Sequence, residues 1–185
     1  MRGFGPKFHR LQKNTPTSMI FLESPKKYTA HKIIKNGTYT KMNCHLTEDC
    51  PFCISQDGPP QNGLYAIALM TDARLHYFDI TAELFRVMRN SAREFCHNNS
   101  VRFDSMSTFI KNKLVIITKI FSNGEFAKYD VGYKTIGSDQ MKKLENKFYN
   151  NGKPVDALQT MIDDLDELVR PGTYEEDKEF MYGDR

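Results

Sequence analysis

The sequence predicts a mainly β fold with α additions, in the form of a small Greek-key barrel followed by C-terminal helices. Three observations predict it. About seven short stretches have strand character and are separated by turn residues, and one stretch of helical periodicity stands before the last two strands. In addition, three of the four cysteines lie within residues 44–53, which predicts a metal-binding loop inserted in the barrel.

The expected strands are short, and most are bounded by Gly, Asn, Asp or Pro. Asn36-Gly37-Thr38 is the strongest hairpin-turn signal, and continuous apolar character marks residues 64–71 as a buried strand. The strands are expected at residues 18–24, 28–35, 39–44, 64–71, 74–80, 113–120 and 126–135. With a helix between the fifth strand and the last pair, this order favours an OB-fold-like Greek-key barrel.

Three helices are expected. Thr81 is a suitable N-cap for the first, and Arg86, Arg89 and Arg93 lie away from its apolar stripe. That stripe is formed at helical spacing by Leu84, Phe85, Met88, Ala92 and Phe95. Residues 97–109 are expected to form a loop. The other helices are expected at residues 138–149 and 154–170, the last of which stops at an Arg-Pro-Gly sequence.

Charge is distributed unevenly along the chain, whose net charge is +3. Residues 1–45 carry nine Lys or Arg and one acid, whereas residues 156–185 carry ten acids and three basic residues. A basic front and an acidic end suggest an anionic partner and a tail that competes with it, although uneven surface charge alone gives the same pattern. The expected organisation is a flexible basic arm (1–17), a barrel core (18–136) with a zinc subdomain at about 31–63, C-terminal helices (137–170) and a disordered acidic tail (171–185).

Composition excludes several classes of protein. No apolar run approaches the roughly 18 residues of a membrane-spanning helix, and the N-terminal residues lack the apolar segment of a secretory signal. A soluble protein of the reducing cytoplasm is therefore expected, where a stable disulfide is unfavoured. The sequence contains no Walker loop, no G-x-G-x-x-G and no G-x-S-x-G, so we do not expect an enzyme.

The cysteine cluster reads CHLTEDCPFC and ends in the pair Cys50 and Cys53. A C-x2-C pair can hold a zinc ion from a tight turn, and Cys44 can fold back as a third ligand. The fourth ligand is His31, across the predicted hairpin, or His45, whose adjacency to Cys44 is geometrically awkward. We therefore predict one structural Zn²⁺ per chain. A redox pair, for which the βαβ setting is absent, and unligated structural cysteines are the alternatives. Cys96 is expected in the core.

The spacing His31-x12-Cys44-x5-Cys50-x2-Cys53 resembles the zinc subdomain of bacteriophage single-stranded DNA-binding proteins of the T-even helix-destabilising type. The layout of basic arm, strands flanking a zinc loop, helix and acidic tail is also similar. The resemblance implies a zinc-containing OB-fold that coats and protects single-stranded DNA in phage replication and recombination, within the host cytoplasm. It also implies an acidic tail that recruits replication or recombination proteins and shields the DNA groove.

Single-strand binders need cations for the phosphates and flat rings for the bases. The predicted hairpin interleaves the two residue types, and on its first strand Tyr28 and Lys32 share one face while His31 points to the other. The predicted DNA contacts are Lys26, Lys27, Tyr28, Lys32, Lys35, Tyr39, Lys41, Arg74, Tyr77, Phe78, Arg86 and Arg89. The alternative for Tyr77 and Phe78 is a core position. The alternative for Arg86 and Arg89 is a solvated helix face.

Two other functions remain open from the sequence. In the first, the zinc loop and the acidic helix at 154–170 form a protein-interaction module that docks a polymerase or transcription factor. In the second, scattered acids converge into a metal-dependent nuclease. The first predicts no tight oligonucleotide binding, and the second predicts strand cleavage with added magnesium or manganese.

Overall fold

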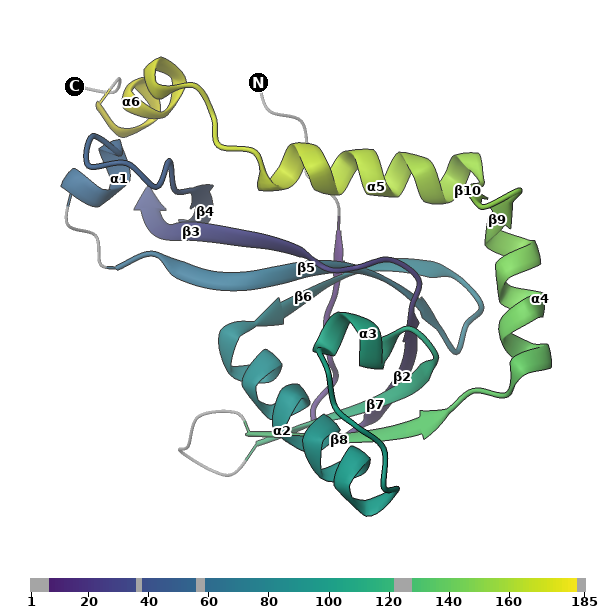
Figure 1. Cartoon of the computed structure of the whole chain (residues 1–185). Coiled ribbons are helices and arrows are strands. Elements are labelled where there is room, and N and C mark those ends of the chain that lie inside the picture. The colour runs from purple at the N-terminus through teal and green to yellow at the C-terminus, as the bar shows by residue number, and fades with distance from the viewer. Residues whose placement is uncertain (1–6, 36–37, 56–58, 122–127, 183–185) are drawn as a thin grey trace.

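A computed structural model describes residues 7–35, 38–55, 59–121 and 128–182 (Figure 1). The protein is mainly β, with one large mixed sheet and several helices, as the sequence predicts. The sheet contains β1 (Phe8–His9), β2 (Pro16–Phe21), β3 (Lys26–Lys35), β4 (Thr38–Asn43), β5 (Gln61–Met70), β6 (Leu75–Thr81), β7 (Lys113–Ile120) and β8 (Lys128–Thr135).

The strand order is β1-β6-β5-β2-β7-β8, and the β3–β4 hairpin is attached to β5. The long strand β5 pairs with β3 along its first half and with β2 at its end, so both strands lie on the same edge of β5. All pairs are antiparallel except β1 with β6. Over the described residues the path ends at β8, with no pairing that returns from β8 to β6.

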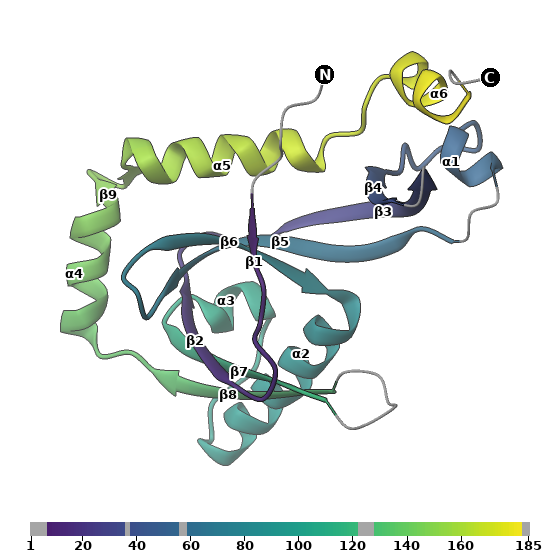
Figure 2. The same ribbon diagram turned by 180° about the vertical axis from the view of Figure 1, so that it is seen from behind.

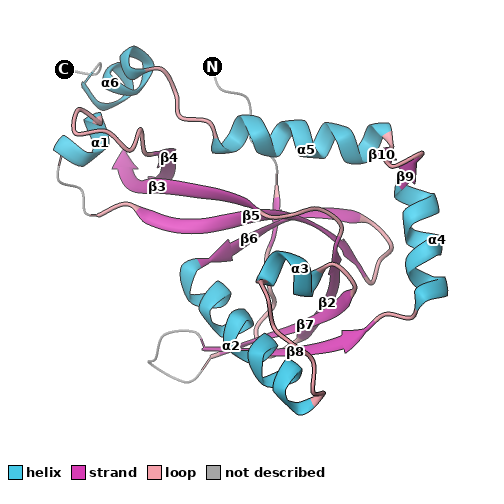
Figure 3. Cartoon of the chain, viewed as in Figure 1, coloured by secondary structure: helices cyan, strands magenta, loops and turns pink. Residues whose placement is uncertain are grey.

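The helices are shown in cyan in Figure 3. They are α1 (Pro51–Ile54), α2 (Ala82–Asn98), α3 (Met106–Ile110), α4 (Ser138–Phe148), α5 (Asp156–Val169) and α6 (Tyr174–Tyr182), and a short β9–β10 pair (Tyr149–Asn150, Lys153–Pro154) joins α4 to α5. The predicted cap is confirmed, because the Thr81 side chain accepts a hydrogen bond from the Leu84 amide at the start of α2. Among the described helices, none has both the length and the apolar character needed to cross a membrane.

Three segments have more structure than their composition and periodicity predict. The expected loop at 97–109 contains α3, which Ser105 caps and whose Met106 and Ile110 are buried. The expected flexible arm contains β1, which pairs with β6 and whose Phe8 ring packs at 4.8 Å from the Tyr65 ring. The expected disordered tail contains α6, which is held by a contact described below.

The sheet has a different helix layer on each face, as Figures 1 and 2 show. On one face, Met19, Phe78 and Ile117 pack against α2 and α3, and this face forms the larger core. On the other, Ile20 and Ile67 pack against α4 and α5. A third, smaller cluster lies between the β3–β4 hairpin and α1 and consists of Ile33, Met42, Cys44, Cys50 and Phe52.

Gly63 marks a close approach between two strands. It pairs with Tyr28 across the β3–β5 ladder, and a Cβ atom added to Gly63 would collide with the Tyr28 ring. Because the ring is enclosed by the core, we expect Gly63→Ala to lower the free energy of unfolding by about 1–3 kcal/mol, the usual cost of overpacking. Urea unfolding measures this loss. Gly132→Ala, where an added Cβ meets nothing within 4 Å, is the matched control.

Candidate metal centre

Four potential metal ligands come from three neighbouring elements. His31 lies on β3 opposite Met42 of β4, and its side chain is only 1% exposed. Cys44 directly follows β4, and its amide donates a hydrogen bond to the carbonyl of Thr29 on β3. Cys50 is the N-cap of α1, which places Cys53 one turn further along the same helix. The hairpin therefore supplies two ligands and the short helix the other two.

The ligand atoms are as close together as one small ion requires. The Cys44 Sγ atom lies 3.9 Å from Cys50 Sγ and 3.6 Å from Cys53 Sγ. The His31 Nε2 atom lies 3.3 Å from Cys53 Sγ and 3.9 Å from Cys50 Sγ, and all four ligand atoms are within 4.8 Å of one another. Tetrahedral coordination with zinc–sulfur bonds of about 2.3 Å separates two sulfurs by about 3.8 Å. The four side chains can therefore hold a metal ion, and their types and spacing are compatible with structural zinc.

Backbone amides donate hydrogen bonds to sulfurs of this cluster, and those at Cys50 favour its thiolate form. The Leu46 amide donates to Cys44 Sγ at 3.4 Å. Burial raises the pKa of Cys50, but hydrogen bonds from the amides of His45, Cys53 and Phe52 outweigh it, so the pKa lies below its ordinary value. Desolvation and the neighbouring Cys44 and Cys50 thiols raise the pKa of Cys53 to about 12. Three crowded sulfurs cannot all ionise without a cation between them, and a bound metal supplies that charge.

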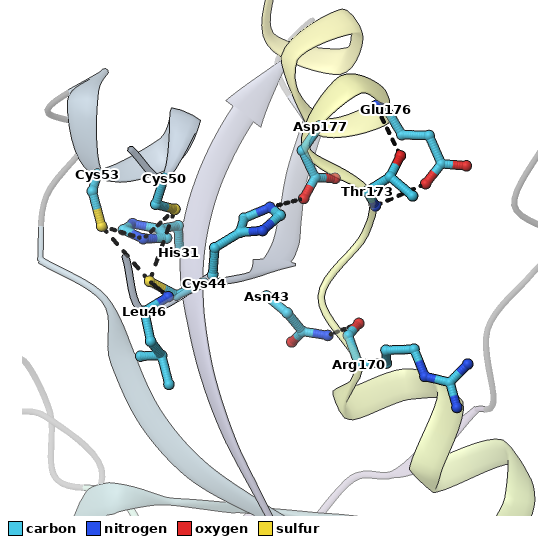
Figure 4. A network of polar contacts seen from close by, with 11 residues as sticks. His31, Asn43, Cys44, Leu46, Cys50, Cys53, Arg170, Thr173, Glu176 and Asp177 are labelled. Atoms are coloured by element: carbon cyan, nitrogen blue, oxygen red, sulfur yellow. Dashed lines mark hydrogen bonds and ion pairs between the residues drawn. The ribbon is translucent and has the colours of Figure 1, made fainter. Parts of the chain in front are cut away.

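His45, the alternative fourth ligand, lies outside the four-ligand cluster and contacts α6 instead. Its Nε2 atom lies 2.8 Å from Asp177 Oδ2 on α6, and the Asp177 side chain is 1% exposed. The Tyr174 ring of α6 packs edge-on at 6.4 Å from the His45 ring. Figure 4 shows the four-ligand cluster on one side of the hairpin and Asp177 on the other. Composition alone predicts disorder for this tail. The contact between His45 and Asp177, which composition does not reveal, attaches α6 to the hairpin.

The hairpin also holds the end of α5. The Asn43 side-chain amide donates to the carbonyls of Leu168, at 2.5 Å, and Arg170, at 3.0 Å. Leu168 belongs to the last turn of α5 and Arg170 is the C-cap residue, so no further helical amide is available to their carbonyls. The end of β4 therefore caps α5, and the metal cluster and the C-terminal helices meet at one place.

A second group of polar and aromatic side chains lies under α5 and includes several predicted DNA contacts. The Tyr28 and Tyr65 rings are stacked at 4.2 Å, with Lys41 Nζ 4.8 Å from the centre of the Tyr28 ring. The Phe8 ring lies between those of Tyr65 and Tyr77. The Tyr28 hydroxyl donates to Asp79 at 2.8 Å, and burial followed by this hydrogen bond raises the pKa of Tyr28. The cluster of Phe8, Tyr28, Lys41, Tyr65 and Tyr77 is called here the ring–lysine face.

The acidic side of α5 contacts Tyr77 of this face and Lys26, which pairs with Tyr65 across the β3–β5 ladder. Asp166 forms a 2.7 Å ion pair with Lys26, and Asp164 accepts a hydrogen bond from the Tyr77 hydroxyl. Tyr28 is only 4% exposed. While α5 is docked, carboxylates occupy the positions next to cations and rings that a nucleic-acid strand would need.

The remaining predicted contacts are dispersed. Phe78 is 1% exposed and belongs to the core on the opposite face, the alternative weighed for it. Arg86 and Arg89 are exposed on α2, also across the sheet from α5, and Arg74 is exposed beside the turn between β5 and β6. Lys27 and Lys32 are exposed on β3, whereas the side chains of Lys35 and Tyr39 lie outside the described part of the chain. Cys96 is buried in α2, as predicted.

Sequence reasoning missed three residues of the surface under α5. Tyr65 was assigned only to a buried strand, Phe8 to a flexible arm, and Asp79 was not paired with Tyr28. The alternation of Tyr65 with the small Ala66 and Ala68 of the opposite face could have identified the ring as facing a different layer.

Comparison of the chain with models of protein families, with curated proteins and with solved structures finds no match. Function must therefore be inferred from the residues themselves.

Proposed function

We propose that the protein binds single-stranded DNA, coats and protects it during phage DNA replication or recombination, and uses zinc structurally. The observation that carries the proposal is the ring–lysine face beside a Cys3His cluster. Stacked rings with a lysine over them are the groups that a single strand uses, since bases stack on rings and phosphates pair with cations. Lys41 is ion-paired with Asp79 of β6, so a phosphate would take the place of that carboxylate. No catalytic step is assigned to the protein.

The fold supports this proposal through its strand order. The path β6-β5-β2-β7-β8, with α2 between β6 and β7, is consistent with a partly open OB-like barrel. In that reading the β3–β4 hairpin with α1 is the inserted zinc subdomain. Zinc would be held by His31, Cys44, Cys50 and Cys53 in a closed site, where its role is to fix the hairpin that carries Lys32 and Lys41.

The position of α5 adds a condition to the proposal. Asp164 accepts a hydrogen bond from Tyr77 of the ring–lysine face, and Asp166 pairs with the neighbouring Lys26. A DNA strand would therefore compete with α5 for that ring and that cation. Replication or recombination proteins that bind the acidic C-terminal region would then favour the open face.

The test is titration of a fluorescently labelled oligo-dT with the protein at two salt concentrations, with metal content measured on the same sample. We expect salt-sensitive binding and one zinc per chain. Asp164→Asn with Asp166→Asn should raise the affinity about 1.4- to 5-fold, because the exposed Asp166–Lys26 ion pair that is removed contributes about 0.2–1 kcal/mol.

Asp163→Asn with Glu167→Gln is the matched control, because it removes the same charge from exposed positions of α5. Its effect should be smaller, since Asp163 bonds only to Gln159 of its own helix in the described contacts. Absence of oligonucleotide binding by every variant would contradict the proposal.

The coverage of the ring–lysine face by α5 favours one alternative function. In a protein-interaction module, α5 would cover this face permanently. The β3–β4 hairpin with its metal cluster and the acidic C-terminal helices would dock a polymerase or transcription factor. It predicts one zinc per chain with no oligonucleotide binding, even after Asp164 and Asp166 are neutralised.

A further inference from the structure

Phe121 is an exposed aromatic residue close to two lysines, away from the ring–lysine face. It directly follows β7 and is 38% exposed. Lys119 Nζ lies 4.9 Å from the centre of its ring, and Lys13 Nζ lies 5.7 Å from it. An exposed ring with two cations close to it is suited to a ligand that carries both a flat aromatic group and negative charge.

The backbone around Phe121 is fixed by a segment distant in the sequence. Asn14 donates its amide hydrogen to the Lys119 carbonyl at 2.8 Å and accepts from the Phe121 amide through Oδ1 at 3.3 Å. Asn14 has a φ of 53°, a left-handed conformation that Asn tolerates better than most residues. Lys13 and Lys119 also form a parallel bridge. The ring and its two lysines are therefore placed by tertiary structure.

A basic segment connects this position to the ring–lysine face. Phe8 pairs with Tyr77 on β6, and five residues later Lys13 pairs with Lys119 on β7. At about 3.3 Å per residue the segment spans at most about 16 Å. It carries exposed Arg10 and Lys13, and Figure 2 shows it running down from β1 toward β7 and β8.

We propose that Phe121, Lys13 and Lys119 form a second contact site for single-stranded nucleic acid, with the ring stacking on a base and the lysines pairing with the flanking phosphates. This inference rests on the proposed function and adds a contact that remains accessible while α5 covers the ring–lysine face. An arriving strand would bind here first and then follow Arg10 toward Phe8 as α5 yields.

The contact can be observed directly because the chain contains no Trp. In Phe121→Trp, the only tryptophan would report on this ring, and stacking of thymine on it should quench its fluorescence as oligo-dT is added. Inorganic polyphosphate, which offers phosphates without bases, should produce no comparable quenching. Tyr174→Trp is the matched control, because Tyr174 is 40% exposed and has Lys178 Nζ 5.9 Å from its ring centre, but lies among Glu175, Glu176 and Asp177.

Affinity measurements complete the test. Phe121→Leu should weaken oligo-dT binding about 5-fold or more, in line with the loss of one stacked base. Lys13→Gln with Lys119→Gln should reduce the slope of log affinity against log salt by about 1.4, whereas Lys178→Gln should leave it unchanged. If the wild type binds oligo-dT but Phe121→Trp is not quenched and Phe121→Leu binds normally, the second site is excluded and the proposed function stands. If the wild type does not bind, both fall.

Discussion

Loss of a metal ion held by the four-ligand cluster is expected to free α6 as well as the β3–β4 hairpin. Cys50→Ser removes a ligand that is fully buried and that begins α1. We expect zinc affinity to fall by about 100-fold or more, because the loss of a ligand should exceed the loss of a residue that only hydrogen-bonds to a ligand. α6 packs on α1 and on His45, which adjoins Cys44. Without the metal, residues 44–54 should become disordered and should no longer hold α6. Trypsin should then cut quickly after the exposed Lys178, and the same result should follow chelation of wild-type protein.

The matched control is Cys96→Ser, the same substitution at a buried cysteine of α2 outside the cluster. It should keep one zinc per chain and protect Lys178 as the wild type does. The expectation fails if Cys50→Ser retains stoichiometric zinc, or if it loses zinc while the rate of cleavage after Lys178 stays unchanged.

Leu158→Ala should cause the largest loss of stability among single changes in α5. Leu158 is fully buried and packs in the cluster that contains Tyr28 and Tyr65. Truncating a buried leucine lowers the free energy of unfolding by about 2–5 kcal/mol, which for a chain of 185 residues lowers Tm by about 4–20 °C. Because the Leu158 side chain helps to attach α5 to the sheet, the variant should also bind oligo-dT more tightly.

Thermal unfolding and the oligo-dT titration measure the two effects. Ile162→Ala, a truncation in the same helix at a half-buried position, is the control and should produce a smaller shift in both. A large loss of stability with unchanged affinity would show that α5 does not limit access to the ring–lysine face.

The cluster that can hold a metal ion could be predicted from sequence because the chemistry is local. The three cysteines lie within ten residues, and a Cys-x2-Cys spacing has few uses other than metal binding or redox chemistry. The choice between His31 and His45 could not be made from spacing alone. It depends on the β3–β4 pairing, which buries His31, and on Asp177, which contacts His45 from a position 132 residues away.

The strands and the main helices could be predicted because their apolar periodicity is strong. The covering of Tyr28 could not, because it depends on which face of the sheet α5 packs against. Tyr28 reads equally well as a stacking ring in solvent and as a core residue whose hydroxyl reaches Asp79. Phe121 was missed for a related reason, since its partner Asn14 is 107 residues away in the sequence.

The long separation between His45 and Asp177 has a consequence for biosynthesis. At about 5–20 residues per second, residue 177 is added about 7–26 s after residue 45, so the nascent chain exposes all four metal ligands well before α6 exists. Metal loading on the ribosome would therefore precede docking of α6. The β3–β4 hairpin and α1 would then already be folded when α6 is synthesised, and α6 would dock on their surface.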